Sequence, residues 1–263
     1  SMNDMAAELS SQIGRLEDLS RVQQRFVSDV SHELRTPLTT VRMAADLIYD
    51  ERDEMPPFAS RSAELMRLEL DRFESLLADL LEISRFDAGA AVVSLEETDL
   101  VHVVCEELDA QQAFAASKGC ELILRSTGPA RAQMDARRIT RIVRNLVTNA
   151  IEHGESRPIE VTVASNDRAV AVSVRDHGIG FRPDQAEQVF LRFWRADPSR
   201  NRTVGGTGLG LAISREDTLL HHGLLQAWGR PGQGAQFVLV LPVDQEQAQV
   251  VGADSPIRLG VAP

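Results

Sequence analysis

The sequence predicts an α+β protein in which an antiparallel helical hairpin is followed by a layered α/β sandwich. Apolar residues recur every three or four positions across residues 9–86, which is the periodicity of amphipathic helices. From residue 99 onward, helical stretches alternate with short runs of period two, which are typical of half-buried strands. The segment 87–90 separates the two regions, and its sequence Asp-Ala-Gly-Ala indicates a hinge.

Composition excludes several classes of protein. The net charge of −11 and the pI near 5.1 argue against direct binding of nucleic acid, because no basic excess exists to displace counterions. Cys105 and Cys120 lack C-x-x-C spacing, so neither a disulfide framework nor a zinc site is indicated. No window holds the ~18 consecutive apolar residues of a membrane span. Ser1-Met2 resembles a remnant of expression, and we expect the chain to be part of a longer protein.

The first region is predicted to be a hairpin of two helices. One helix covers about 9–49 and is interrupted by Pro37, where the carbonyl of Glu33 loses its partner and the helix should bend. Pro56-Pro57 lies in the turn, and the second helix covers about 59–86. Its a/d seam is widened by further leucines, which one hairpin cannot cover. The seam residues are Ala63, Met66, Leu70, Phe73, Leu77 and Leu80. We therefore predict a dimeric four-helix bundle, the alternative being that the hairpin packs on its own C-terminal domain.

A histidine in the first helix is a candidate nucleophile. His32 is two positions from both Val30 and Leu34, about 200° around the helix from each, so it faces away from the apolar seam. Glu33 follows it directly, and an exposed imidazole beside a carboxylate suits a nucleophile that meets a mobile partner. The alternative is a surface histidine without a role. A zinc protease is excluded, because H-E-x-x-H requires histidine where Thr36 stands.

The second region is predicted to contain mostly antiparallel strands and helices capped by Asp99 and Asp135. Residues after 243 are expected to form a loosely ordered tail. The predicted helices are 99–118, 135–153, 208–221 and a short one at 185–193, and the predicted strands are 92–95, 120–125, 130–134, 159–164, 169–175, 224–228 and 236–241.

The helix at 135–153 carries a polar face. Asn145 and Asn149 are four residues apart and share this face with Arg141 and His153. The amide oxygens could hold a metal ion, and a solvated polar face is the alternative. The opposite side of the helix is rich in isoleucine, valine and leucine and must pack on the sheet.

Two glycine-rich segments indicate a phosphate-containing ligand. In 176–180, Gly178 and Gly180 permit close approach of the backbone to a ligand, and the Asp176 carboxylate suits an adenine amine, the alternative being a simple turn. Residues 205–211, Gly-Gly-Thr-Gly-Leu-Gly-Leu, lead directly into a helix, whose free N–H groups and dipole favour a phosphate. This segment is neither a Walker loop nor a Rossmann loop. Two further glycines, at 232 and 234, are explained by a plain turn.

In this order the motifs resemble those of the sensor histidine kinases. The resemblance covers residues 26–241, and 3–25 resemble the end of a HAMP signalling module. The matching boxes are the phosphoacceptor H-box (31–38), the N-box (145–153), the G1 box (176–180), the F-box (190–195) and the G2 box (205–211). The resemblance implies a HAMP or signalling helix (1–25), a dimerisation and histidine phosphotransfer domain (26–88), a hinge (89–98), a catalytic ATP-binding domain of the Bergerat (GHKL) type (99–243) and a flexible tail (244–263).

The resemblance also implies a role for each matching residue. His32 would accept phosphate from ATP, Glu33 would accept a hydrogen bond from its Nδ1–H, and Thr36 would orient water for dephosphorylation of a partner. Asn149 would bind Mg²⁺, and residues 196–204 would form a lid. The residues implied in binding ATP are Asn145, Asn149, His153, Asp176, Gly178, Gly180, Arg195, Gly206, Thr207, Gly208, Leu209 and Gly210.

The implied partners are a second copy of the chain and the receiver domain of a response regulator. The implied location is the cytoplasmic portion of an inner or plasma-membrane sensor, attached only through upstream segments absent here. One departure is Glu152, where many relatives carry lysine or arginine, and it puts nucleotide affinity in doubt. Two alternatives remain at this stage: a chaperone-like or topoisomerase-like ATPase, which would have glutamate in place of Asn145, and a non-catalytic docking module.

Overall fold

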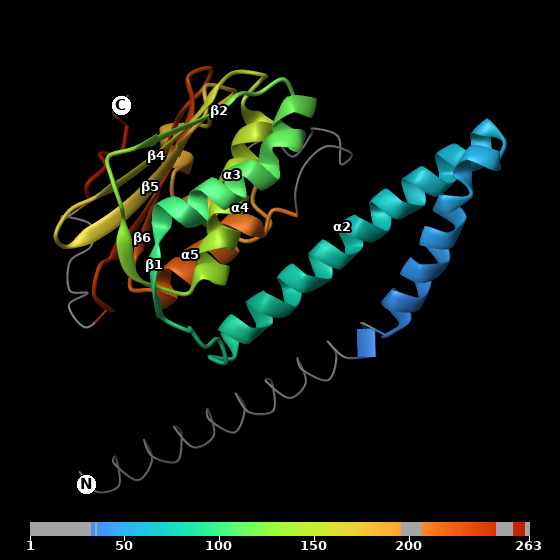
Figure 1. Ribbon diagram of the computed structural model, residues 1–263, viewed down its shortest axis with the longest axis horizontal. Helices are drawn as coiled ribbons and strands as arrows, with labels where there is room; N and C mark the ends of the chain where they lie inside the picture. Colours follow the sequence, from blue (N-terminus) through green and yellow to red (C-terminus); the bar gives the residue numbers. More distant parts are fainter. Residues whose placement is uncertain (1–32, 35, 196–206, 246–254, 261–263) are drawn as a thin grey trace, which may run out of the picture. The chain divides into compact units, whose positions relative to one another are not determined.

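The computed structural model describes residues 33–34, 36–195, 207–245 and 255–260, in two compact units that divide at Val92 (Figure 1). Predictions that concern His32, Gly206, the segment 1–25 and the lid therefore lie outside the described residues. The two units are described separately below.

The first unit is the predicted helical hairpin. Residues 33–34 and 36–50 are helical. A 3₁₀ turn, η1 (Arg52–Glu54), then leads to helix α2 (Pro57–Asp87). Pro56 has the extended backbone that the sequence predicts, with ψ of 147°. Pro57 opens the helix, because the first helical position needs no N–H donor.

Charged and aromatic side chains join the two helices of the hairpin. Arg42 forms ion pairs with Asp71 and with Glu74, the latter at 3.2 Å. Near the turn, the guanidinium carbons of Arg52 and Arg67 lie 4.2 Å and 4.3 Å from the ring centroid of Tyr49. Such cation–π contacts fix the helices in register at a site rich in charge.

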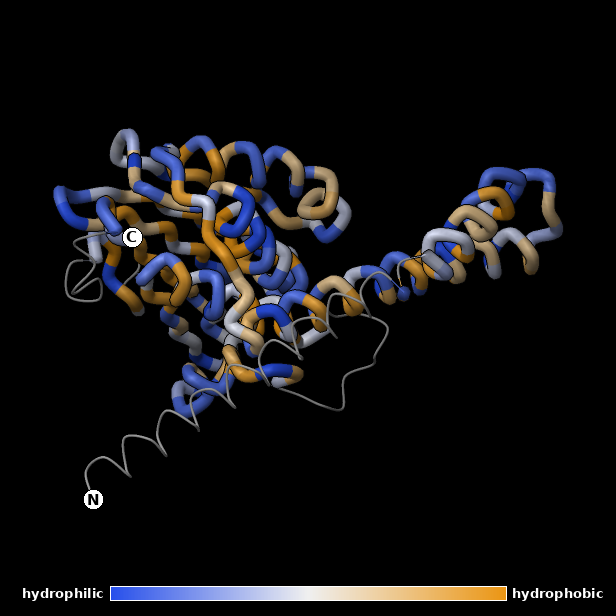
Figure 2. Tube along the Cα trace, turned by 90° about the horizontal axis from the view of Figure 1, so that it is seen from below, coloured by the Kyte–Doolittle hydropathy of each residue, from blue (hydrophilic) through white to orange (hydrophobic). Residues whose placement is uncertain are grey.

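The hairpin leaves most of its apolar seam uncovered. Its buried apolar residues are small or near one end, namely Ala45, Ala63 and Ile83. Phe73 on the predicted seam is 52% exposed and Leu47 on the facing helix is 69% exposed. Figure 2 shows apolar segments recurring along both helices. Large apolar side chains are therefore exposed on both helices of the hairpin.

The second unit contains a five-stranded sheet with helices on one face (Figure 1). The strand order is β2-β4-β5-β7-β6, with β2 parallel to β4 and the other pairs antiparallel. A separate two-stranded sheet pairs β1 with β3. The strands are β1 (Glu96–Asp99), β2 (Leu122–Ser126), β3 (Arg131–Met134), β4 (Ile159–Ser165), β5 (Ala169–Arg175), β6 (Leu224–Arg230) and β7 (Gly234–Pro242). The helices are α3 (Leu100–Ser117), α4 (Ala136–His153) and α5 (Gly210–Leu220).

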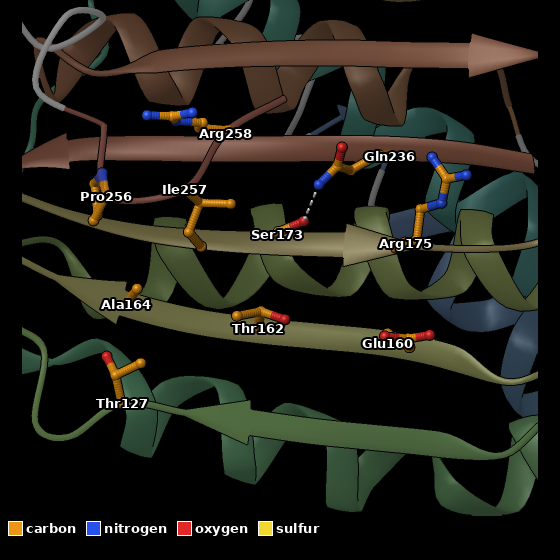
Figure 3. A pocket seen from close by; sticks show the side chains of 10 residues that line it. All are labelled: Thr127, Glu160, Thr162, Ala164, Ser173, Arg175, Gln236, Pro256, Ile257 and Arg258. Atoms are coloured by element: carbon orange, nitrogen blue, oxygen red, sulfur yellow. Dashed lines mark hydrogen bonds between the residues drawn. The ribbon is translucent and has the colours of Figure 1, made fainter. Parts of the chain in front are cut away.

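Residues 255–260 pack on the face of the sheet that the helices leave open. Ile257 and Leu259 contact the buried alanines and valines of β5 and β7, and the N–H of Gly260 donates to Oε1 of Gln236 at 2.7 Å. A pocket of about 250 Å³ lies between this segment and the sheet, beside the bond from Gln236 to Ser173 (Figure 3). The prediction of a loosely ordered tail is wrong for these residues, because the apolar outer face of β5 and β7 needs a cover.

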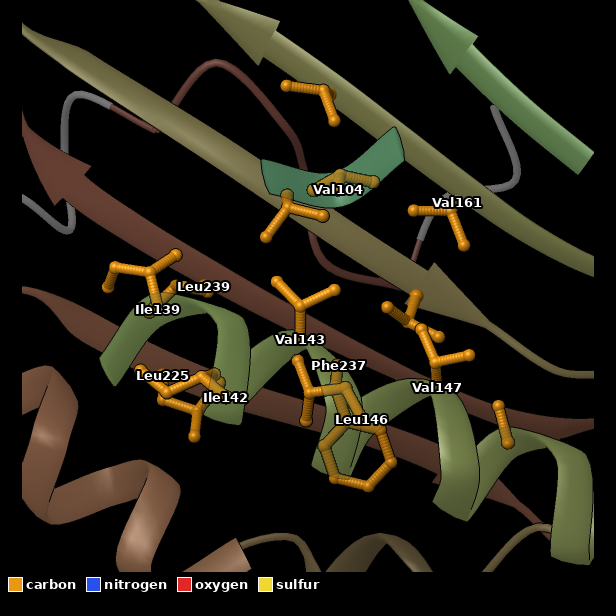
Figure 4. Close-up of a cluster of buried hydrophobic side chains, with 14 of the residues drawn as sticks. Val104, Ile139, Ile142, Val143, Leu146, Val147, Val161, Leu225, Phe237 and Leu239 are labelled. Carbon is orange, nitrogen blue, oxygen red and sulfur yellow. The ribbon is translucent and has the colours of Figure 1, made fainter. Parts of the chain in front are cut away.

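The main core lies between α4 and the inner face of the sheet. Five residues of the predicted apolar face of α4 have no exposed area, and they contact strand residues such as Val161, Phe237 and Leu239 (Figure 4). Burial of each such side chain stabilises the fold by about 1.5–3 kcal/mol. The five are Ile139, Ile142, Val143, Leu146 and Val147.

Two predicted elements are wrong. Residues 92–95 do not form a strand, because the ladder with β3 falls on residues 96–99 and the Ser94 N–H donates to Oδ2 of Asp135. The predicted short helix at 185–193 is replaced by two 3₁₀ turns, η2 (Pro183–Gln185) and η3 (Gln188–Phe190). Phe193 has a φ of 60°, which a right-handed helix cannot accommodate.

Candidate functional site

The C-terminal end of α4 supports the Asp176–Gly180 segment. The N–H of Ile179 donates to the carbonyl of His153 at 3.2 Å. A Cβ atom built on Gly178 would lie 1.8 Å from that same carbonyl oxygen, so only glycine fits. The predicted N-box and G1 box are therefore in direct backbone contact.

Asp176 lies at the end of β5 and is only 2% exposed. Its Oδ1 accepts hydrogen bonds from the N–H of Gly178 at 2.9 Å and of Ala235 at 3.2 Å. Burial raises the pKa of the Asp176 carboxyl, while these two hydrogen bonds and the nearby His153 and Arg175 oppose that rise. Both backbone bonds use one oxygen, so the arrangement presents a carboxylate of fixed orientation at the strand end.

The turn before β7 is part of this support, which the sequence analysis missed. A Cβ atom on Gly234 would lie 2.1 Å from the carbonyl oxygen of Asp176, and one on Gly180 would lie 2.0 Å from that of Arg230. The N–H of Gly232 donates to the carbonyl of Ile179 at 2.8 Å. The glycines at 232 and 234 thus do more than form a plain turn. Glycines 232 and 234 are two residues apart, like glycines 178 and 180, and this shared spacing is the sequence signal that could have indicated their supporting role.

The second glycine-rich segment leads into α5. Oγ1 of Thr207 accepts a hydrogen bond from the N–H of Leu209 at 3.1 Å, and Gly208 has a φ of 73°. The carbonyl of Gly208 accepts from the N–H of Phe193 at 2.8 Å, so the predicted F-box and G2 box are also in contact. The N–H groups of the first turn of α5, which starts at Gly210, point out of the helix end, where an anion is favoured.

Asn145 links α4 to the first turn of α5. Its Nδ2 donates to the carbonyl of Gly210 at 3.0 Å and to Oγ of Ser214 at 3.1 Å. Asn149, one turn further along α4, is half-buried. Glu152, the departure from the family pattern, is also half-buried.

The second unit therefore brings most predicted ligand-binding residues into contact with α4 or with its neighbours. Arg195 is half-buried and lies two residues beyond Phe193. In the first unit, Glu33 and Thr36 are exposed helical residues.

The described residues contain no group of three or more His, Cys, Asp or Glu side chains that could hold a metal ion. Cys105 and Cys120 are free cysteines, and Cys120 is buried. Within the described ranges, no helix is long and apolar enough to cross a bilayer. The pocket under residues 255–260 opens on the outer face of the sheet, whereas the helices lie behind the opposite face (Figure 3).

Comparison with known families agrees with this geometry. Residues 22–89 match the His Kinase A (phospho-acceptor) domain, and residues 134–245 match the histidine kinase-, DNA gyrase B- and HSP90-like ATPase domain. The chain belongs to the sensor histidine kinase family.

The chain is also similar to individual sensor histidine kinases. The sensor histidine kinase MtrB of Mycobacterium leprae is 57% identical over 244 residues, which is 92% of this chain and 43% of that protein. MtrB of Mycobacterium tuberculosis H37Rv is 56% identical over 246 residues, again 92% and 43%. The histidine-protein kinase AfsQ2 of Streptomyces coelicolor is 34% identical over 92% of this chain and 46% of that protein. The chain thus spans less than half the length of these relatives.

Solved structures confirm the fold. Full-length ShkA in complex with AMPPNP superposes with a TM-score of 0.72 at 28% identity, over 89% of this chain and 47% of that one. The histidine kinase ThkA in complex with the response regulator protein TrrA gives a TM-score of 0.60 at 23% identity, over 85% and 62%.

Proposed function

We propose that this chain is the catalytic core of a two-component sensor kinase. It transfers the γ-phosphoryl group of ATP to His32 and from there to an aspartate of a response regulator. The observation that carries the proposal is the convergence of three separate segments on α4 and its neighbours, with a glycine at each close contact. Gly178 lies on the His153 carbonyl, Gly210 lies on the Asn145 amide, and Gly234 lies on the Asp176 carbonyl.

The second unit supplies the nucleotide site in this proposal. Asp176 accepts a hydrogen bond from the exocyclic amine of adenine. Because the carboxylate is buried, a base that presents a hydrogen-bond donor to it is favoured over a base that presents an acceptor. Thr207, Gly208, Leu209 and Gly210 surround the phosphates with N–H groups at the start of α5. Arg195 approaches the phosphates. Gly206 and the lid (196–204), which lie outside the described residues, complete the proposed site. The AMPPNP complex of ShkA supports this assignment.

The residues on α4 suit magnesium bound together with the phosphates. Mg²⁺ takes only one or two protein ligands in such sites and obtains the rest from phosphate and water. Asn149 offers one amide oxygen from a half-buried position, and no cluster of acidic side chains among the described residues competes for the ion. When bound, the ion neutralises charge on the phosphates.

The first unit supplies the nucleophile. Nε2 of a neutral His32 attacks the γ-phosphorus, a P–N bond forms, and the bond to the leaving ADP oxygen breaks. Glu33 accepts a hydrogen bond from Nδ1–H, which leaves the Nε2 lone pair free and stabilises the cationic ring that forms. In the second transfer, an aspartate oxygen of the receiver domain attacks the same phosphorus and the P–N bond breaks.

We propose a reverse activity for Thr36. It is exposed and lies one turn beyond His32, where its hydroxyl can orient water toward the phospho-aspartate of the receiver domain. The alternative is that Thr36 merely precedes Pro37 and has no chemical role.

We also propose the domain organisation and the homodimer. The segment 1–25 is the end of a HAMP module, 26–88 the dimerisation and phosphotransfer domain, 89–98 the hinge and 99–243 the ATP-binding domain. The exposed seam residue Phe73 and the exposed Leu47 on the facing helix support pairing of two hairpins. The longer protein is a membrane-anchored sensor, of which this chain is a cytoplasmic portion.

Two other functions are less well supported. A chaperone-like ATPase needs a carboxylate base where Asn145 stands, and the Asn145 amide instead donates to the Gly210 carbonyl, a bond that a carboxylate cannot make. A docking module without activity would not need glycine at so many close contacts.

The test is labelling with ATP carrying a radioactive γ-phosphate. The chain should acquire an acid-labile, base-stable adduct, which is the signature of phosphohistidine. A His32→Gln variant that binds ATP but does not label is the expected control. Full labelling of that variant would refute the assignment.

A further inference from the structure

Helix α5 carries a buried charge that the proposed chemistry does not use. Asp217 lies in the middle of α5 and has no exposed area. Its carboxylate accepts a hydrogen bond from Nη1 of Arg138 at 2.7 Å and from Nε of Arg141 at 2.8 Å. Nη2 of Arg141 makes a second bond at 2.7 Å, so that guanidinium binds the carboxylate through two nitrogens.

A buried ion pair of this kind is not the most stable choice for a helix interface. Desolvation opposes the ionised carboxylate and raises the pKa of Asp217, against the effect of the two guanidinium groups. Replacement of a buried pair by well-packed apolar side chains is often neutral or stabilising. What the pair offers is geometry, because two parallel N–H···O bonds fix both distance and direction, whereas apolar contacts allow sliding.

Two further polar contacts lie near the two ends of α5. At its start, Asn145 of α4 donates to the Gly210 carbonyl and to Oγ of Ser214. Directly after its end, Nε2 of the C-cap residue His221 accepts the N–H of Asp135, the residue that caps α4, at 3.0 Å. Polar contacts therefore join the two helices or their caps from the first turn of α5 to the residue that follows it.

We infer that Asp217 is a positioning residue for the nucleotide: with Arg138 and Arg141 it fixes the rotation and axial position of α5. The helix in turn places the backbone N–H groups at residues 207–210. The inference rests on the proposed function, because it assumes that these N–H groups bind the phosphates. A small rotation of α5 would carry Gly210 away from Asn145 and would move every donor of the first turn together, since a helix moves as a rigid element.

The chain offers a matched control for this inference. Glu107 on α3 is 2% exposed, and Nε and Nη2 of Arg144 on α4 each bind its carboxylate at 3.0 Å. The Glu107 carboxylate is nearly as buried as that of Asp217 and is likewise bound by a guanidinium through two nitrogens, although the Arg144 side chain is itself 55% exposed. This pair joins α4 to α3 rather than to α5, so its loss should leave the glycine segment in place.

The experiment compares Asp217→Asn with Glu107→Gln by calorimetric titration with magnesium AMPPNP and by the ATP dependence of labelling. Both variants should lose thermal stability. Only Asp217→Asn should raise the dissociation constant and the KM for ATP, by about 2- to 30-fold, the range for contacts that act through a neighbouring element. A purely structural role would instead reduce the fraction of active protein in both variants at unchanged KM.

A second variant guards against misfolding of Asp217→Asn. Ser214→Ala removes one buried oxygen that bonds to both Asn145 and the Gly210 carbonyl, and it should raise the KM by a few fold in a folded protein. If the KM is unchanged in Ser214→Ala and in any folded Asp217→Asn protein, the inference is overturned but the proposed function is not. Failure of the unmodified chain to bind magnesium AMPPNP would overturn both the inference and the proposed function.

Discussion

Gly210 lies directly on the side-chain amide of Asn145. The Gly210 carbonyl accepts a hydrogen bond from Nδ2 of Asn145 at 3.0 Å, and a Cβ atom at Gly210 would lie 3.2 Å from the Asn145 amide carbon. Few real Cβ atoms lie so close to a neighbour. The start of the helix that we assign to phosphate binding is thus in direct contact with one side chain of α4.

Gly210→Ala should separate nucleotide affinity from stability. The new methyl group must push Asn145 aside by a few tenths of an ångström and shift the first turn of α5. Alanine stabilises a helix relative to glycine by about 1 kcal/mol. This gain offsets the cost of displacing Asn145, so the melting temperature should change little. The dissociation constant for magnesium AMPPNP should rise several-fold. An affinity equal to that of the unmodified chain would show that the contact does not govern the loop.

Gly178→Ala should destabilise the second unit severely. The added methyl group would lie 1.8 Å from the backbone carbonyl oxygen of His153, which cannot rotate away as a flexible side chain could. We expect a loss of more than about 3 kcal/mol, which is rare among single substitutions. The free energy of unfolding is measured by denaturant titration.

Gly232→Ala, in the same unit, is the control for that measurement. A Cβ atom there meets nothing within 4 Å, so only its positive φ of 73° opposes the change, by about 1–2 kcal/mol. Equal losses for the two variants would mean that the crowding at Gly178 is relieved by movement of the loop.

Much of this fold follows from local patterns in the sequence. The apolar face of α4 is periodic, and both Asp99 and Asp135 are capping residues whose side chains accept backbone N–H groups of the helix they precede. The G1 and G2 segments were found because glycine is unusual beside a strand end and at a helix start. These signals depend only on neighbouring residues.

The sequence-based predictions that were wrong concern features that depend on contacts between residues far apart in the sequence. Residues 92–95 look like a strand, but the position of β1 is set by its ladder with Arg131–Met134. The sequence predicts a loosely ordered tail because two apolar residues, Ile257 and Leu259, do not make a periodic pattern. The residues that they contact lie on β5 and β7. The role of Asp217 was missed for the same reason, since Arg138 is 79 residues away.

His221 should make the second unit sensitive to mild acid. It is fully buried, Nε2 accepts the Asp135 N–H, and Nδ1 donates to the Asp217 carbonyl at 2.7 Å, so both nitrogens are used in the neutral ring. Burial lowers the pKa of His221 below its ordinary value near 6.5. As the pH falls below about 6.5, the unfolded chain gains a proton that the folded chain excludes, so stability falls by up to about 1.4 kcal/mol per pH unit.

The measurement is the free energy of unfolding between pH 7 and pH 5 for the unmodified chain, His221→Gln and His102→Gln. The His102 side chain is 71% exposed, so its replacement should leave the pH dependence intact. His221→Gln should be less stable at pH 7 but show a flatter profile. A slope that survives in His221→Gln would assign the acid sensitivity to other groups.

The segment 255–260 should contribute to the stability of the second unit. Ile257 is half-buried on the alanines and valines of the outer sheet face. Its truncation in Ile257→Ala should cost about 1–2 kcal/mol, less than the 2–5 kcal/mol of a fully buried site. Differential scanning calorimetry measures this loss. Arg258→Ala, at an exposed neighbouring position, should change the melting temperature little, and an equal effect of both would argue against apolar packing as the cause.

Phe73→Glu should convert the proposed homodimer to a monomer. Phe73 lies on the a/d seam of α2 and is 52% exposed in a single chain, so in a four-helix bundle it would be covered by the second hairpin. A carboxylate buried there without a partner is strongly unfavourable, whereas in the monomer it is solvated. Phe58→Glu is the matched control, because Phe58 is 82% exposed at the second residue of α2, beyond the seam. Light scattering after size-exclusion chromatography should give the mass of a dimer for the unmodified chain and for Phe58→Glu, and that of a monomer for Phe73→Glu. A dimer that persists in Phe73→Glu would place the interface away from this seam and remove the support that the exposed leucines and phenylalanine give to the bundle.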